Sequence, residues 1–84
     1  MPMLPRVKAN EVIRVLEKLG FVQIRQKGSH VILKKQIAVG KGEDQQMIEV
    51  GCVVPLHNKD LAVGTLNNIL KQAGVSVEEF IQNL

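Results

Sequence analysis

The sequence predicts a two-layer α+β domain in which helices pack on one face of a three-stranded antiparallel sheet, in the order α-β-β-β-α-α. Three observations predict it. Apolar residues recur at helical spacing near the start of the chain, change to a period of two in the middle, and return to helical spacing near the end. A chain of 84 residues is short for more than one domain, so we expect residues 1–84 to form a single domain.

The first helix is expected after Pro5, from about Lys8 to Leu19. Gly20 follows, at the position where helices often end in a left-handed residue, and Lys18 lies in the last turn, where a positive charge suits the helix dipole. The stripe that would face the core consists of Val12, Ile13, Leu16 and Leu19.

Two strands should follow as a hairpin. From Phe21 to Gln26 the period of two predicts a half-buried strand with Val22 and Ile24 directed inward. Lys27, Gly28 and Ser29 can turn the chain, and the segment His30–Lys34 then pairs back. If Val31 and Leu33 face the core, the other face of this hairpin carries Arg25, His30, Ile32 and Lys34.

The third strand is expected from Met47 to Val54, ended by Pro55, which lacks the N–H donor that a central ladder needs. Before it, Gln36–Gln46 contains Gly40 and Gly42 and is expected to be a long, mobile hairpin connection that can include extensions of both strands.

Two helices complete the predicted fold. The first runs from about Gly64 to Ala73 and ends at Gly74. The second begins at the capping-box pattern Ser76–Glu79, and its apolar stripe consists of Val77, Phe80, Ile81 and Leu84.

Composition narrows the function classes. Hydrophobic residues make up 45% of the chain, which suits a globular domain, yet no apolar run reaches the roughly 18 residues of a membrane span. No signal peptide is visible, and the single cysteine, Cys52, fits a reducing compartment, so we expect a cytoplasmic protein without a membrane partner. Cys52 is expected to be a small buried hydrophobe. One Cys and two distant His residues give no zinc-ligand spacing, so we assign no metal and no cofactor.

Charge is distributed unevenly along the chain. Residues 1–35 carry eight Lys and Arg side chains against two Glu, a net charge of +6, whereas residues 36–84 carry three Lys against six acidic side chains, a net charge of −3. A polyanion such as nucleic acid is the natural partner of the basic half, although scattered solvated lysines are the commoner reason for mild basicity.

His30 is the candidate catalytic residue. It lies in the basic half at the start of a strand, and histidine is the side chain that exchanges a proton near neutral pH. By itself, an outward histidine is more often a surface residue than a catalyst. His57 is expected in a loop beyond the third strand, where bonding to backbone or water is its commoner role and catalysis a secondary possibility. Because Phe21 and Phe80 occupy core positions, phosphate contacts would have to replace base stacking.

Several short motifs, in order, resemble the HicA toxins of bacterial and archaeal toxin-antitoxin systems. Their positions are Leu4–Arg6 leading into Val12–Ile13, Leu19–Phe21, Gly28–His30, Val54–His57, Gly64–Leu66, Ile69–Leu70, Ala73–Ser76 and Glu79–Phe80. Each motif alone is weak, whereas their order and spacing together are specific. The segment Gln36–Gln46 departs from the family pattern because it is longer than the tight turn expected there.

This resemblance implies a fold like that of a double-stranded-RNA-binding domain and the activity of an mRNA interferase, a metal-independent endoribonuclease. It places the essential histidine after the Gly-Ser turn, at His30, and implies a HicB-like antitoxin that covers the active face. In that reading His30 is the general base, and the RNA-binding residues are Arg25, Lys27, Gly28, Ser29 and Lys34.

Two other classes of function stay open. The same basic face can serve a non-catalytic RNA-binding module in which His30 is only a contact, or a protein-interaction domain whose surface serves its partner. Chemistry at position 30 distinguishes them, because only the enzyme needs an imidazole there.

Overall fold

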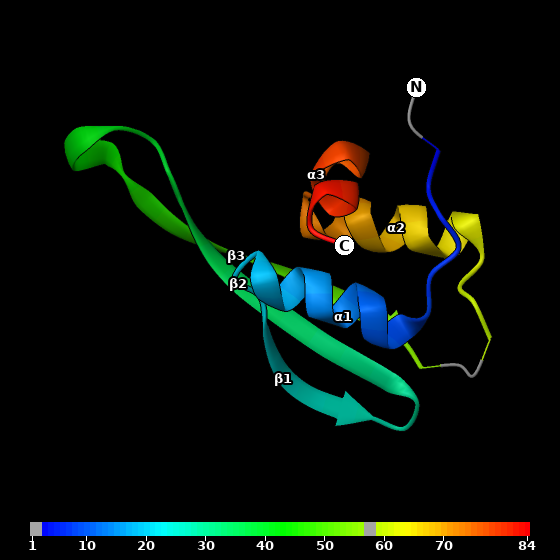
Figure 1. Ribbon diagram of the computed structural model, residues 1–84. Helices are drawn as coiled ribbons and strands as arrows, with labels where there is room; N and C mark the ends of the chain where they lie inside the picture. The colour runs from blue at the N-terminus through cyan, green and yellow to red at the C-terminus, as the bar shows by residue number, and fades with distance from the viewer. Residues whose placement is uncertain (1–2, 57–58) are drawn as a thin grey trace.

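The computed structural model describes residues 3–56 and 59–84, and Figure 1 traces its elements along the chain. The predicted order α-β-β-β-α-α is confirmed, with one short 3₁₀ turn added between the second and third strands. The elements are α1 (Ala9–Lys18), β1 (Val22–Lys27), β2 (His30–Val39), η1 (Gly42–Asp44), β3 (Gln46–Pro55), α2 (Val63–Ala73) and α3 (Val77–Gln82).

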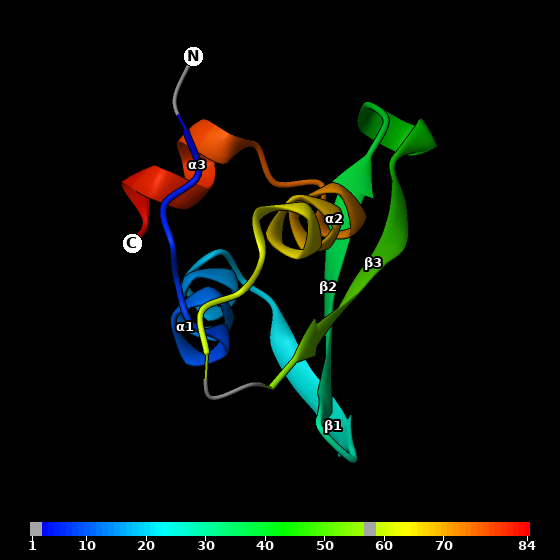
Figure 2. The same ribbon diagram turned by 90° about the vertical axis from the view of Figure 1, so that its right-hand side faces the viewer.

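The three strands form an antiparallel meander with β2 in the centre. Figure 2 shows α1 and α2 on one side of this sheet, with α3 farther from it. The opposite side carries no helix among the described residues. The sheet therefore has one covered face and one open face, as the sequence predicts.

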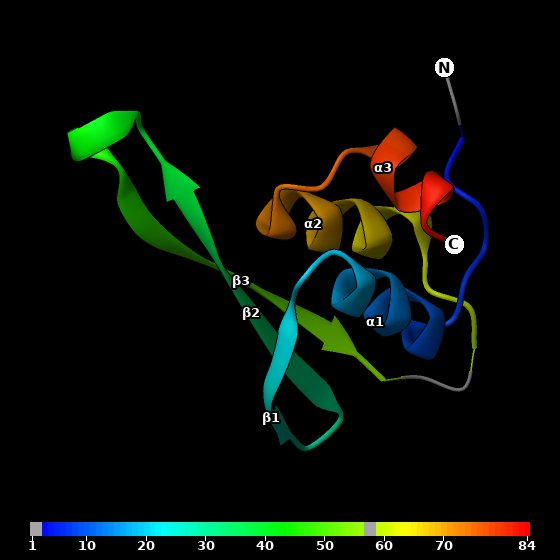
Figure 3. The same ribbon diagram turned by 60° about the vertical axis from the view of Figure 1, so that its left-hand side comes forward.

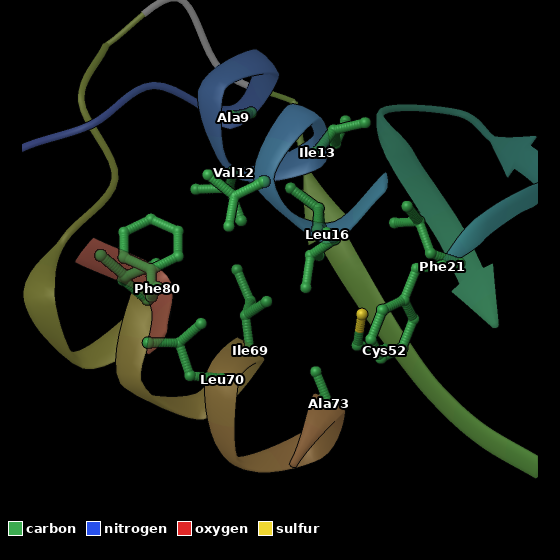
Figure 4. Packing of buried hydrophobic residues seen from close by; sticks show 14 of the residues in the cluster. Ala9, Val12, Ile13, Leu16, Phe21, Cys52, Ile69, Leu70, Ala73 and Phe80 are labelled. Atoms are coloured by element: carbon green, nitrogen blue, oxygen red, sulfur yellow. The ribbon is translucent and has the colours of Figure 1, made fainter. Parts of the chain in front are cut away.

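The core lies between the covered face and the helices (Figure 4). The sheet contributes the alternating pairs Val31 and Leu33 from β2 and Cys52 and Val54 from β3, all at most 2% exposed. Phe80 of α3 is fully buried as well. The helices supply most of the remaining buried side chains, namely Ala9, Val12, Ile13, Val15, Leu16, Leu66, Ile69, Leu70 and Ala73.

The ends of the helices follow the predicted signals. Gly20 comes just after α1 with a φ of 102°, and Gly74 ends α2 in the left-handed region with a φ of 71°. At α3, the Ser76 hydroxyl accepts a hydrogen bond from the Glu79 N–H at 3.1 Å, which supplies the forward half of the predicted capping box.

The predicted burial of β1 is wrong. All six of its residues are exposed, and Val22 and Ile24, which were expected to face inward, are 60% and 53% exposed. A β-bulge between Gln23 and Arg25 inserts one extra residue into this edge strand and shifts its register against β2. Phe21, one residue before the strand, is the buried apolar residue instead.

The connection between β2 and β3 is far shorter than the predicted loop. β2 continues to Val39 and β3 begins at Gln46, so most of the segment Gln36–Gln46 consists of the strand extensions and the 3₁₀ turn. The two strands project beyond the helices as a twisted ribbon (Figure 3). The radius of gyration, 13.5 Å, accordingly exceeds the value of about 12 Å expected for a compact chain of this length.

Candidate nucleic-acid interface

A tight turn positions the candidate histidine. Gly28 and Ser29 connect β1 to β2, and Gly28 adopts a φ of 60°, which a residue with a Cβ rarely adopts. Glycine in the first central position is typical of the type II′ hairpin turn. The Gln26 side-chain amide donates to the Gly28 carbonyl at 3.0 Å, and the Leu56 N–H donates to the Ser29 carbonyl at 2.6 Å. The turn is therefore fastened to both neighbouring segments.

His30 begins β2 directly after this turn. It pairs with Lys27 on one side and Pro55 on the other, so strands flank it in both directions. The next residue, Val31, is only 2% exposed and anchors the backbone to the core, whereas the His30 side chain is exposed. No hydrogen bond fixes the imidazole among the described residues. The backbone at position 30 is thus held firmly while the ring is left accessible.

The strand register brings the predicted cations to the same face as His30. Directly paired residues of an antiparallel sheet project from the same face. Lys27 pairs with His30, Arg25 pairs with Ile32, and Ile32 and Lys34 follow His30 at steps of two. The prediction that Arg25, His30 and Lys34 share the open face is confirmed, and Lys27 joins them. We call Arg25, Lys27, His30 and Lys34 the basic face.

An acidic residue that the sequence analysis did not assign also lies on the basic face. Glu49 pairs with Gln36 on the open side, and its Oε1 lies 3.1 Å from the Lys34 Nζ. Both side chains are about half exposed, so this ion pair contributes at most about 1 kcal/mol and a phosphate can replace the carboxylate. The expected third strand already contains Glu49, but this ion pair could be foreseen only with the β2–β3 register and the extension of β2 past Lys34 known.

Lys35, the neighbour of Lys34, belongs to the covered side. Its Nζ lies 5.8 Å from the centre of the Phe21 ring, a cation–π distance. Charge therefore divides between the two sides of β2 as strand alternation requires, and only Lys34 contributes to the basic face.

Apolar side chains border the basic face. Val22 and Ile24 line a shallow hollow at the edge of the sheet, whose other lining residues are Gly20, Lys34, Lys35, Gln36 and Glu49. Ile32 is half-buried and Val53 is 38% exposed in the middle of the sheet. The open face is consequently mixed: its cations lie on β1 and β2, and aliphatic side chains lie among them.

The remaining candidate residues are separate from this face. His57 lies outside the described residues, so its predicted loop position is untested. Cys52 is 2% exposed, as expected, and burial raises the pKa of its thiol to about 11, which keeps it protonated at neutral pH. In residues 3–56 and 59–84, no three His, Cys, Asp or Glu side chains gather as metal ligands.

The fold and the site define a small α+β protein with a histidine and three cations on an open sheet face. Comparison with models of known families then places the chain: residues 9–75 match the model described as the HicA toxin of bacterial toxin-antitoxin systems. The match covers well over half of the chain, and the protein belongs to the HicA toxin family. Membership implies that it acts as the toxin of a toxin-antitoxin pair. No curated protein matches the chain. None of the described helices is long and apolar enough to cross a membrane.

Proposed function

We propose that this toxin is an endoribonuclease that cleaves mRNA with His30 as general base. The observation that carries the proposal is the placement of His30, which is exposed at the start of the central strand beside Lys27 and held there by the fastened Gly28–Ser29 turn. A general base must be accessible to the substrate and must be attached to a backbone with a fixed position, and His30 meets both requirements.

The reaction follows from the chemistry of RNA. Neutral His30 accepts the proton of a ribose 2′-hydroxyl, and the 2′ oxygen attacks the adjacent phosphorus. The bond from phosphorus to the 5′ oxygen of the next nucleotide breaks, and that oxygen takes up a proton. The products are a 2′,3′-cyclic phosphate and a free 5′-hydroxyl. His57 is the candidate donor of the second proton.

The cations would hold the phosphate and stabilise its developing negative charge. Arg25 and Lys27 lie on β1 beside the His30 row, and Lys34 lies farther along the same face of β2. The exposed hydroxyl of Ser29 and the backbone at Gly28 offer further phosphate contacts at the turn. Because Phe21 and Phe80 are buried at 4% and 0% exposure, affinity rests on phosphates and not on base stacking.

A HicB-like antitoxin is the proposed inhibitor. A protein that presents acidic groups to the basic face would associate rapidly, fix its orientation by charge and occlude His30. Such a partner also accounts for the exposed aliphatic residues Val22 and Ile24 beside the cations, since burying them would add affinity.

One observation favours a second candidate, a non-catalytic RNA-binding module. The imidazole of His30 has no orienting hydrogen bond in the described part of the chain, whereas catalytic bases are commonly oriented by a second group. In this alternative the same four side chains of the basic face bind RNA without cutting it.

His30→Ala distinguishes the two. The exposed side chain contributes little to the core, so the variant should fold and bind RNA normally, while cleavage falls by about 10²–10⁴-fold, the usual contribution of a general base. The control is Lys41→Ala, a surface substitution far from His30 along the ribbon, which should cut at the natural rate.

The end groups of the product complete the test. The natural protein should leave 2′,3′-cyclic phosphates in the presence of EDTA. Cleavage by His30→Ala at the natural rate, or cleavage abolished by EDTA, would remove the catalytic assignment.

A further inference from the structure

The projecting ribbon has no role in the proposed reaction. We define the arm as residues Lys35–Val50, the part of β2 and β3 beyond the last pair with β1, Val22 with Lys34. It extends away from the helices in Figures 1 and 3. It exposes apolar side chains, with Val39, Met47 and Ile48 at 37%, 61% and 42% exposure. A two-stranded ribbon is only marginally stable in water without a further partner.

Two hydrogen bonds fix which backbone groups of the arm are free. The N–H of Leu56 donates to the Ser29 carbonyl across the β2–β3 ladder, whereas the N–H of Val53 donates outward to the Gln72 side chain at 3.4 Å. Backbone direction alternates along a strand, so the odd-numbered residues of β3 point outward. By the register, the even-numbered residues of β2 point away from β3.

On β2, the outward N–H and C=O groups of the even-numbered residues face β1 from His30 to Lys34. Beyond that residue no strand lies beside β2 in the described part of the chain. The outward N–H and C=O groups of Gln36 and Ala38 therefore form a free edge.

The free edge of β3 suits a second strand less well. Gln72 occupies its outward group at Val53, a common protection of sheet edges. A symmetric pairing that used all of Met47, Glu49 and Gly51 would place Glu49 opposite Glu49 of the other copy. Like charges directly opposite one another destabilise a sheet.

We propose that the arm is a self-association element in which two copies of this chain pair antiparallel through the β2 edges, with the two-fold axis at Ile37. Gln36 of each copy lies opposite Ala38 of the other, and each such pair exchanges two N–H···O=C bonds. The two Ile37 side chains meet on the axis as a non-hydrogen-bonded pair, the type in which side chains approach most closely. The interface is isologous and closes at two copies.

Charge favours a second copy over nucleic acid as the occupant of the arm. The arm carries Lys35 and Lys41 against Glu43, Asp44 and Glu49, so it is weakly acidic and does not attract phosphate. In the proposed pairing, Val39 of one copy lies opposite Lys35 of the other. Gly40, two residues before the acidic turn Gly42–Asp44, then lies opposite Lys34 of the second copy.

The size of the contact sets its strength. Overlap is limited to residues 35–39 of each copy, because β1 is paired with the same edge of β2 from Lys34 back to His30. A standard stable interface uses about 20–30 residues a side, so this dimer should dissociate on dilution. The pairing continues one sheet across both copies, which sets the two basic faces on the same side.

Sedimentation of the full chain over a range of concentrations tests the proposal with two matched proline variants. Ala38→Pro removes an outward N–H from the β2 edge and should leave only the 9.3 kDa monomer. Met47→Pro removes the equivalent outward N–H from the β3 edge and should keep the dimer. A natural chain that stays monomeric at every concentration, or a dimer lost only in Met47→Pro, overturns the proposal.

A disulfide test identifies the axis directly. In Ile37→Cys, the new cysteines of two copies face each other across a Cα separation of about 4.5 Å, within disulfide range. Mild oxidation should therefore yield covalent dimers. Ile48→Cys, its cross-strand neighbour within one chain, lies off the axis and should yield few. Native Cys52 is buried, so it should not form a disulfide between copies. Equal cross-linking of both variants, or of neither, overturns the axis at Ile37.

Discussion

The two halves of the β2–β3 ribbon share one register and one alternation of side chains, yet they differ in what lies behind them. In the half from His30 to Lys34 and its β3 partners, helices cover one face, and Val31, Leu33, Cys52 and Val54 are buried. In the arm, the same face passes the end of α2, where Ile37 and Val50 still line a hollow with Ala73, and beyond that point Val39 and Ile48 are partly exposed. Burial on this sheet is therefore decided by where the helices end.

This difference assigns different tasks to the halves. The backbone of the helix-backed half is held against the core. A side chain that projects from the open face of this half, such as His30, is therefore attached to a backbone with a fixed position. The arm has few buried contacts and two exposed edges, the features of low local stability. Chemistry that needs fixed geometry belongs in the first half, and adaptable association belongs in the second.

The largest expected effect comes from shortening the same residue type in each half. Val31 and Val39 lie on the same strand and the same face, with 2% and 37% exposure. Val31→Ala removes two buried methyl groups and leaves a cavity, so it should lower the free energy of unfolding by about 2 kcal/mol or more. Val39→Ala should change it by less than about 0.5 kcal/mol.

Urea denaturation of dilute samples, in which the arms are unpaired, measures both values. An equal decrease in the free energy of unfolding of the two variants would mean that the arm is as well packed as the rest of the domain. The proposed difference between the two halves of the ribbon would then be wrong.

Much of the fold could be predicted because local signals agree with tertiary packing. Gly20 and Gly74 end their helices at positive φ, and the Val31–Leu33 alternation faces the core as its period requires. The exposure of β1 could not be predicted. The bulge near Ile24 forms only when β1 pairs with β2, and it changes which residues of β1 face the core. The alternation of apolar residues within one strand does not indicate such a shift of register.

The site divides in the same way. Arg25, His30 and Lys34 were placed on one face from alternation and a short turn, both local properties. The pairing of Lys34 with Glu49 was missed because it depends on the register between β2 and β3, which places Glu49 opposite Gln36, a residue beyond the expected end of β2 at Lys34. Long two-stranded ribbons are held by cross-strand pairs, which a linear sequence does not display.

A second prediction compares the charges of the halves. Arg25→Gln or Lys27→Gln should each remove about one phosphate contact, so the slope of log affinity for single-stranded RNA against log salt should fall by about 0.7. Lys41→Gln removes the same charge from the arm and should leave the slope unchanged. Filter binding across a salt series measures all three, and an identical decrease for Lys41→Gln would show that affinity follows net charge and not the basic face.

The smallest expected effect lies at the junction of the halves, where Glu49 from the arm side reaches Lys34. Glu49→Gln keeps the shape of the side chain and removes its charge. Because the ion pair is about half exposed, the free energy of unfolding should change by less than about 1 kcal/mol.

The same substitution should improve RNA binding. Lys34 no longer has a competing carboxylate at 3.1 Å, so it can contribute a full phosphate contact, and the salt slope should steepen by up to about 0.7. Glu43→Gln makes the identical charge change in the turn at the tip of the arm. At concentrations too low for self-association it should leave the slope as it is. If Glu49→Gln weakens binding, the carboxylate is positioning Lys34 for the phosphate instead of competing with it, and the boundary of the functional half then extends into the arm as far as Glu49.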